Sequence, residues 1–78
     1  MNNNKIGRVS VWIAKDWSGL HIFSNEPTIT NNGSVDEWYG ILSSFDSVIA
    51  IRNIVYNLTY GWDVSHEPEK ITIKFEIL

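Results

Sequence analysis

The sequence predicts a mainly-β fold, a small antiparallel sheet of four to five strands with at most one short helix, and leaves an α+β arrangement as the alternative. Eleven isoleucines against four leucines favour a sheet, because β-branched side chains fit strands better than helices. Aromatic residues make up 13% of the chain, which indicates a packed core and argues against disorder. A length of 78 residues suits one small domain, residues 1–78, with residues 1–5 as a flexible N-terminus.

Charge and cysteine content exclude several classes of protein. The net charge is −3 and cysteine is absent, so disulfide scaffolds and zinc ribbons are excluded and non-specific nucleic-acid binding is not expected. The chain has neither an apolar run long enough for a bilayer nor a secretory signal, so we expect a cytoplasmic protein without membrane contact. A domain this short buries only about 60–65% of its unfolded surface, and we therefore expect a homo-oligomer.

Two alternating runs open the chain. Residues 8–15 alternate between apolar and other side chains, and residues 19–24 continue the pattern. Between them, Asp16 can open a turn through its side chain, and Gly19 supplies a positive φ. This spacing predicts a β-hairpin.

Turn signals follow in the middle of the chain. Pro27 ends the second run or lies at a sheet edge, and the Asn32-Gly33 pair is a strong turn signal. Residues 35–42 are predicted as a third strand, interrupted by Gly40.

Residues 48–58 fit two alternatives. In a strand, alternate side chains would share one face. In a helix, spacings of three, four and three would place four apolar residues on one side: Val48, Ile51, Val55 and Leu58. β-Branching favours a strand over residues 48–51, whereas residues 52–58 suit a short helix.

The C-terminal strand has the clearest pattern. Apolar side chains at 71, 73, 75 and 77 alternate with polar ones at 72, 74 and 76. This alternation predicts one face in the core and the other in solvent.

Several short motifs together resemble a known group of proteins. They are the hairpin over residues 11–23, Glu26-Pro27, Trp62-Asp63, Glu67-Pro68 and the alternating strand over residues 70–78. The combination resembles a loose group of small uncharacterised proteins from bacteria, phages and mobile elements, over roughly two thirds of the chain. Residues 48–60 depart from that pattern. The resemblance implies a small β-rich fold and a prokaryotic or viral setting, and it transfers no catalytic residue.

The two histidines are the candidates for reactive chemistry. His66 shares the seven-residue stretch 63–69 with three carboxylates, those of Asp63, Glu67 and Glu69, and open metal sites use such ligands. His21 carries an imidazole, the side-chain type whose charge changes near neutral pH and which often serves as a general base. The simpler interpretation of the cluster around His66 is a solvated polar loop. The simpler interpretation of His21 is a half-exposed residue of the sheet. We therefore expect no catalytic residue, no metal and no cofactor.

Aromatic and basic side chains are the candidates for binding. Trp17 occupies a hairpin turn, where it either folds back onto the sheet or is an exposed contact residue. Core is the expected place for Trp38 and Trp62, although Trp62 is also a candidate contact. The basic residues Arg8, Lys15 and Arg52 are scattered, and a pocket for a nucleotide-like anion would need them to converge.

These patterns favour a small non-enzymatic binding protein. The predicted binding residues are Trp17, His21, Lys15, Arg8 and Trp62. A phage or mobile-element accessory that blocks a host factor or sequesters a signalling nucleotide is the expected role. The alternatives are a metal- or histidine-dependent hydrolase and a structural subunit of a homo-oligomeric assembly.

Overall fold

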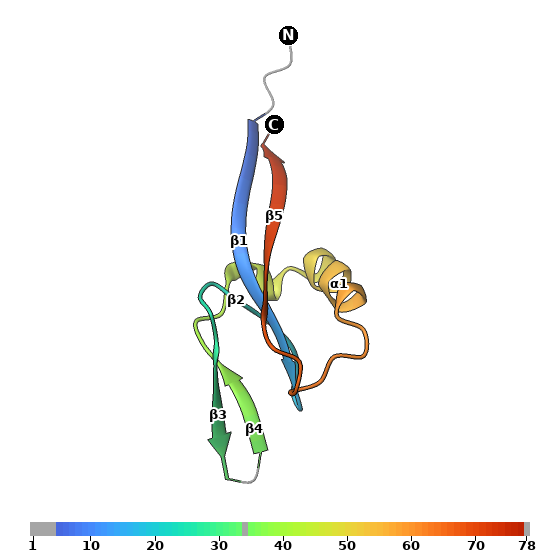
Figure 1. Ribbon diagram of the computed structural model, residues 1–78. Coiled ribbons are helices and arrows are strands. Elements are labelled where there is room, and N and C mark those ends of the chain that lie inside the picture. Colours follow the sequence, from blue (N-terminus) through green and yellow to red (C-terminus); the bar gives the residue numbers. More distant parts are fainter. Residues whose placement is uncertain (1–4, 34, 78) are drawn as a thin grey trace.

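Five strands and two helical segments make up the computed structural model, which describes residues 5–33 and 35–77 (Figure 1). The mainly-β prediction is confirmed, and the strands divide into two antiparallel sheets, one ordered β2-β1-β5 and one formed by β3 and β4. Residues 1–4 of the expected flexible N-terminus lie outside the described residues, and Lys5 begins β1. The elements are β1 (Lys5–Asp16), β2 (Gly19–Phe23), β3 (Thr28–Asn32), β4 (Val35–Tyr39), the 3-10 helix η1 (Ser44–Ser47), α1 (Ile49–Leu58) and β5 (Glu69–Ile77).

The β1–β2 hairpin confirms the predicted opening motif. Asp16 pairs with Gly19, so the loop contains only two residues, and the register places Ile13 opposite Ile22. Gly19 has a φ of 111°, which an L side chain rarely adopts. The turn therefore requires glycine for its backbone conformation.

A second hairpin, β3–β4, forms around the predicted Asn-Gly turn. Gly33 has a φ of 74° at this turn. Strand β4 ends at Tyr39, three residues before the predicted end of the third strand, and Leu42 makes only an isolated bridge to Phe23. Strand β3 itself was missing from the prediction, because its Thr-Ile-Thr alternation is short and lies between two turn signals.

The ambiguous segment 48–58 is helical from Ile49 to Leu58. Ile51 and Val55, four residues apart, face the sheet, so the need to cover its apolar face outweighs the strand preference of β-branched residues. Leu58 is largely exposed, and the helical alternative was therefore right about only part of its predicted face. Neither helical segment of the described chain has the length and apolar character needed to cross a membrane.

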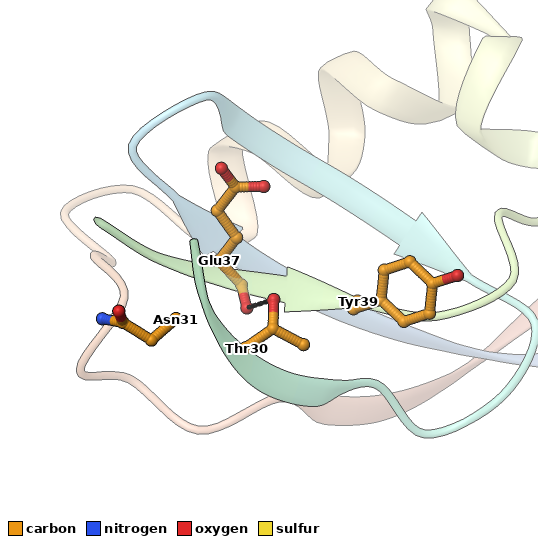
Figure 2. A pocket seen from close by; sticks show the side chains of 4 residues that line it. All are labelled: Thr30, Asn31, Glu37 and Tyr39. Carbon is orange, nitrogen blue, oxygen red and sulfur yellow. Dashed lines mark hydrogen bonds between the residues drawn. The ribbon is translucent and has the colours of Figure 1, made fainter. Parts of the chain in front are cut away.

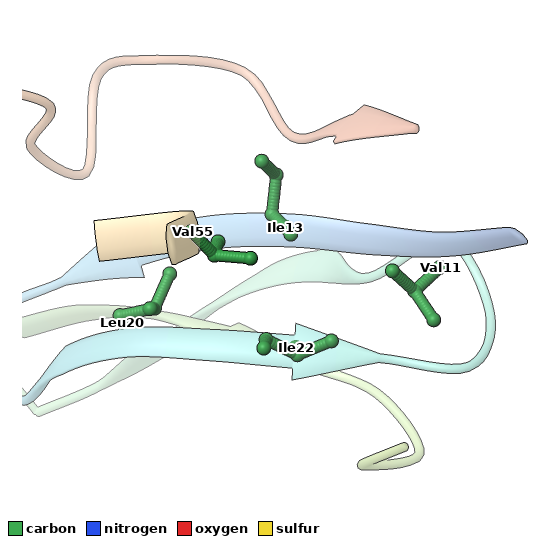
Figure 3. Close-up of a cluster of buried hydrophobic side chains, with 5 residues drawn as sticks. All are labelled: Val11, Ile13, Leu20, Ile22 and Val55. Atoms are coloured by element: carbon green, nitrogen blue, oxygen red, sulfur yellow. The ribbon is translucent and has the colours of Figure 1, made fainter. Parts of the chain in front are cut away.

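The core lies between α1 and one face of the three-stranded sheet (Figure 3). Its buried members come from β1, β2 and α1, and half-buried side chains surround them. Fully burying one such side chain contributes about 1.5–3 kcal/mol. The buried cluster is Val11, Ile13, Leu20, Ile22 and Val55.

The outer edge of β2 is covered by the chain that follows β4. Asp46 Oδ1 accepts a hydrogen bond from the Ile22 amide at 2.8 Å, and the Ser43 amide donates to the Ile22 carbonyl at 2.9 Å. Arg52 donates to Asp46 Oδ1 at 2.9 Å and to the Leu20 carbonyl at 3.0 Å. An edge that would otherwise invite another strand is thus occupied by side chains and loop backbone.

The other end of the sheet narrows to a two-stranded ribbon, in which residues 5–10 of β1 pair with residues 72–77 of β5. The ribbon extends the molecule to 57 Å along its long axis against 21 and 18 Å across (Figure 1). The Phe75 ring lies against Gly7, where a Cβ atom would overlap it, and yet Phe75 is 40% exposed. The prediction that one whole face of this strand lies in the core was wrong, because α1 covers only part of it.

Lys15 connects β1 to the end of α1. Its Nζ donates to the Thr59 carbonyl at 2.8 Å and lies 4.3 Å from the centre of the Tyr56 ring. A cation at a helix C-terminus also interacts favourably with the helix dipole. The residue is only 8% exposed, so its positive charge serves the fold.

Replacing this cation should loosen α1. We expect Lys15→Met to lower the free energy of unfolding by about 1–3 kcal/mol, because the Thr59 carbonyl loses a charged donor in a buried setting. Urea denaturation followed by tryptophan fluorescence measures the effect. Lys5→Met, at an exposed position, is the control. Equal stability of the two variants would contradict the role assigned to Lys15.

Candidate functional site

A hollow of about 450 Å³ lies on the β3–β4 hairpin (Figure 2). Cross-strand pairing places Thr30 opposite Glu37, and the Thr30 hydroxyl approaches the Glu37 carbonyl at 3.4 Å. The Thr30 hydroxyl, the Glu37 carboxylate and the Tyr39 phenol therefore share one open face, whereas the Asn31 amide points to the other face and donates to Asp36 Oδ1 at 2.9 Å. Its lining residues are Thr30, Asn31, Glu37 and Tyr39.

Trp17 reaches this hollow from the β1–β2 turn. Its indole Nε1 donates to Glu37 Oε1 at 3.1 Å, while the residue stays 69% exposed. Trp17 is therefore exposed and does not fold back into the core of the sheet. We call Trp17 together with the four lining residues the hairpin surface.

Asp16 fixes the turn that carries Trp17. Its side chain is 2% exposed, and its Oδ1 accepts hydrogen bonds from the Ser18 amide at 2.9 Å and the Ser18 hydroxyl at 2.7 Å. Its Oδ2 accepts from the Trp38 amide at 3.0 Å. One carboxylate therefore joins the first hairpin to β4 and sets the position of the hairpin surface.

Hydrogen bonding keeps Asp16 ionised. Burial alone would raise the pKa of Asp16, but the hydrogen bonds from the Ser18 hydroxyl and from the Trp38 and Ser18 amides, with the charge of His21, lower it below its usual value. The anchoring carboxylate is thus charged over the whole physiological pH range.

His21 joins the same cluster in an arrangement unlike a catalytic relay. Its Nε2 contacts both the Ser18 hydroxyl, at 2.8 Å, and Asp16 Oδ1, at 3.1 Å. In a Ser-His-Asp relay, the acid and the nucleophile bind different ring nitrogens. Here one ring nitrogen contacts both oxygens, and the Ser18 hydroxyl donates to Asp16. In this geometry His21 reinforces the turn.

The three basic residues that an anion pocket would need do not converge in the single chain. Lys15 binds the end of α1, and Arg52 binds Asp46 and the edge of β2. Arg8 lies on the ribbon, seven residues or about 23 Å along β1 from Lys15 and on the opposite face. An anion such as a nucleotide would find no convergent cations among these residues.

Trp62 and His66 form a separate pair beside the core. Their rings stack with centroids 3.6 Å apart, and His66 Nε2 lies 2.8 Å from Glu69 Oε2. Trp62 is half-buried and packs against the core cluster. Trp38, the other tryptophan expected in the core, is half-buried on β4. Within the described ranges, no three His, Asp or Glu side chains are grouped closely enough to hold a metal ion.

The structure thus brings Trp17 and His21 to one turn and leaves Lys15, Arg8 and Trp62 elsewhere. Sequence reasoning missed the hollow-lining residues on β3 and β4. The available signal was the Thr28–Asn32 alternation just before the Asn-Gly turn, which is typical of a hairpin. The contact between this hairpin and Trp17 spans twenty residues and has no local signal.

Comparison with protein-family models, with curated proteins and with solved structures finds no significant match to this chain.

Removing the Asp16 charge should destabilise the turn in a pH-dependent way. We expect Asp16→Asn to lower the free energy of unfolding by about 1–3 kcal/mol at neutral pH, because buried donors lose an ionised acceptor. The folded-state pKa is below the unfolded one, so this stabilisation is present above about pH 4 and is lost as pH falls through the folded pKa.

Denaturant unfolding between pH 2 and 7 measures the effect. The gap between wild type and Asp16→Asn should shrink in acid, whereas Glu26→Gln, at an exposed loop position, should differ little from wild type throughout. A gap that stays constant down to pH 2 would contradict the assignment.

Proposed function

We propose that this protein is a small non-enzymatic binding protein that contacts a partner protein through the hairpin surface. The observation that carries the proposal is Trp17, an indole that is 69% exposed and yet held in place by its hydrogen bond to Glu37. An exposed tryptophan in a two-residue turn gives the fold little stability. It is, however, the residue type most enriched among the anchors of protein interfaces.

The surroundings of Trp17 support this role. Tyr39 is 70% exposed on the same surface, and the Thr30 hydroxyl adds a hydrogen-bonding group beside it. Interfaces commonly combine aromatic anchors with a polar rim. Because Asp16 fixes the turn and Glu37 fixes the indole, binding would cost less conformational entropy than with a mobile side chain.

Charge favours a protein partner over a nucleotide. Glu37 lines the hollow and Asp36 is exposed next to it, whereas the lining residues include no lysine or arginine. Carboxylates at a binding surface repel phosphates and attract basic groups. A protein patch with an exposed basic side chain therefore fits the hairpin surface better than an anionic ligand does.

The proposed biological role and cellular location come from the sequence. The resemblance to small phage and mobile-element proteins suggests an accessory protein that blocks a host factor, and the proposal keeps the expected cytoplasmic location. It also includes self-association of the chain, which the small core favours.

Removing the indole should abolish partner binding without unfolding the protein. We expect host proteins captured by the wild type to be lost with Trp17→Ala and kept with Tyr60→Ala. Tyr60 is a matched control, because it is 81% exposed and follows α1, on the other side of the sheet.

Affinity capture from host lysate, read by quantitative mass spectrometry for proteins and small molecules, makes the comparison. Circular dichroism confirms that both variants are folded. Identical captured sets for the wild type and Trp17→Ala would overturn the proposal, as would a bound metabolite in place of a protein.

A further inference from the structure

Strand β5 has a single neighbour, and its outer edge is open. In the described part of the chain, β5 pairs only with β1, and no loop backbone donates to it or accepts from it. The opposite edge of the sheet, at β2, is covered by Asp46, Ser43 and Arg52. An isolated two-stranded ribbon is only marginally stable in water, so the ribbon end of β5 requires a further strand.

We propose that this strand is β5 of a second copy of the chain, paired antiparallel about a two-fold axis at Ile73. The two three-stranded sheets would then join into one six-stranded sheet. This inference rests on the self-association proposed above and is independent of the hairpin surface, which lies on other elements.

Strand geometry selects the register. Directly opposite residues in an antiparallel pair point to the same face, so a two-fold axis through the sheet must pass through a residue position. Ile73 is the midpoint of Glu69–Ile77. Centring the axis there pairs all nine residues of the strand, whereas any other centre leaves residues unpaired.

Charge complementarity agrees with this register. With the axis at Ile73, Lys70 lies opposite Glu76 of the second copy, and symmetry repeats the pair at the other end. An axis at Thr72 would place Lys70 opposite Lys74 of the second copy. An axis at Lys74 would place Lys74 opposite Lys74 of the second copy. Like charges directly opposite each other are destabilising, so the Ile73 register is preferred over both of these. An axis at Phe75 would also give two attractive pairs, between Lys74 and Glu76, but it would leave residues 69–72 unpaired.

The apolar face agrees with this pairing. Ile71 would lie opposite Phe75 of the second copy, and Ile73 opposite its own copy. Phe75 is 40% exposed in the single chain, and Ile71 and Ile73 are half-buried beside the core. The pairing would make one continuous apolar strip between the two α1 helices, which lie at opposite ends of the joined sheet.

The free edge of β1 is a weaker candidate. Strand β2 occupies that edge from Trp12 onward, so only residues 5–11 are open. An axis at the centre of this stretch would place Arg8 opposite Arg8 of the second copy, which is a pair of like charges. Lysines on β5 would normally discourage edge pairing, but in the Ile73 register Lys70 faces Glu76 and Lys74 faces Thr72.

A charge-reversal cycle tests the register. Lys70→Glu and Glu76→Lys should each raise the dimer dissociation constant about tenfold, because two attractive pairs become repulsive. The double variant restores both pairs and should recover dimerisation. Lys70 and Glu76 lie about 20 Å apart within one strand and form no ion pair in the described chain, so rescue requires two chains.

Sedimentation equilibrium over a concentration series measures the dimer. Glu26→Lys, an exposed loop position, controls for net charge and should dimerise like the wild type. Trp17→Ala should also dimerise, which separates this inference from the partner-binding surface. A wild-type protein that stays monomeric, or single variants that dimerise as well as the wild type while folded, would overturn it.

A cross-link tests the axis directly, since the chain has no cysteine. Cysteines at Ile73 of two copies would have Cα atoms about 4.5–5.5 Å apart, within disulfide reach. Oxidised Ile73→Cys should therefore migrate as a covalent dimer on non-reducing gels. Lys70→Cys, about 20 Å from its own copy in this register, should stay monomeric. Efficient cross-linking of Lys70→Cys instead would exclude the register.

Discussion

Both faces of strand β1 carry side chains that need to be covered. A chain of 78 residues covers both faces along only half of the strand. Along residues 11–16, α1 covers Val11 and Ile13 on one face, and β4 approaches the other face near Ala14, which is completely buried. Along residues 5–10, β5 is the one described strand that pairs with β1. The remaining features of the molecule follow from this division, because burial is what stabilises a small domain.

The covered half creates the hairpin surface. Packing β4 against β1 takes Asp16 out of solvent, and a buried carboxylate must be satisfied by hydrogen bonds. The donors that satisfy it, Ser18 and the Trp38 amide, lock the turn to β4. Trp17 lies on that turn and reaches Glu37. The exposed aromatic residue is thus positioned by the same polar contacts that stabilise the fold.

The uncovered half explains why the two edges of the sheet differ. The edge at β2 is closed by Asp46 and Arg52, residues that also connect η1 and α1 to the core. The edge at β5 has no such cover in the described chain. With β5 paired across a two-fold axis, the two hairpin surfaces would lie at opposite ends of the joined sheet. A partner that presents two linked sites would then be bound by this dimer with higher avidity.

Local sequence determined the first hairpin, the Asn-Gly turn and the C-terminal strand, because alternation and turn chemistry act between neighbouring residues. It also singled out Trp17 as a contact candidate. Only the tertiary structure decided that residues 49–58 form a helix, since Ile51 and Val55 suit either state until a sheet face has to be covered. The same is true of Lys15, whose ammonium group meets Thr59 across forty-four residues, and of Trp17, whose acceptor Glu37 lies on another hairpin. Contacts between distant segments depend on how the elements pack, and no short pattern encodes that packing.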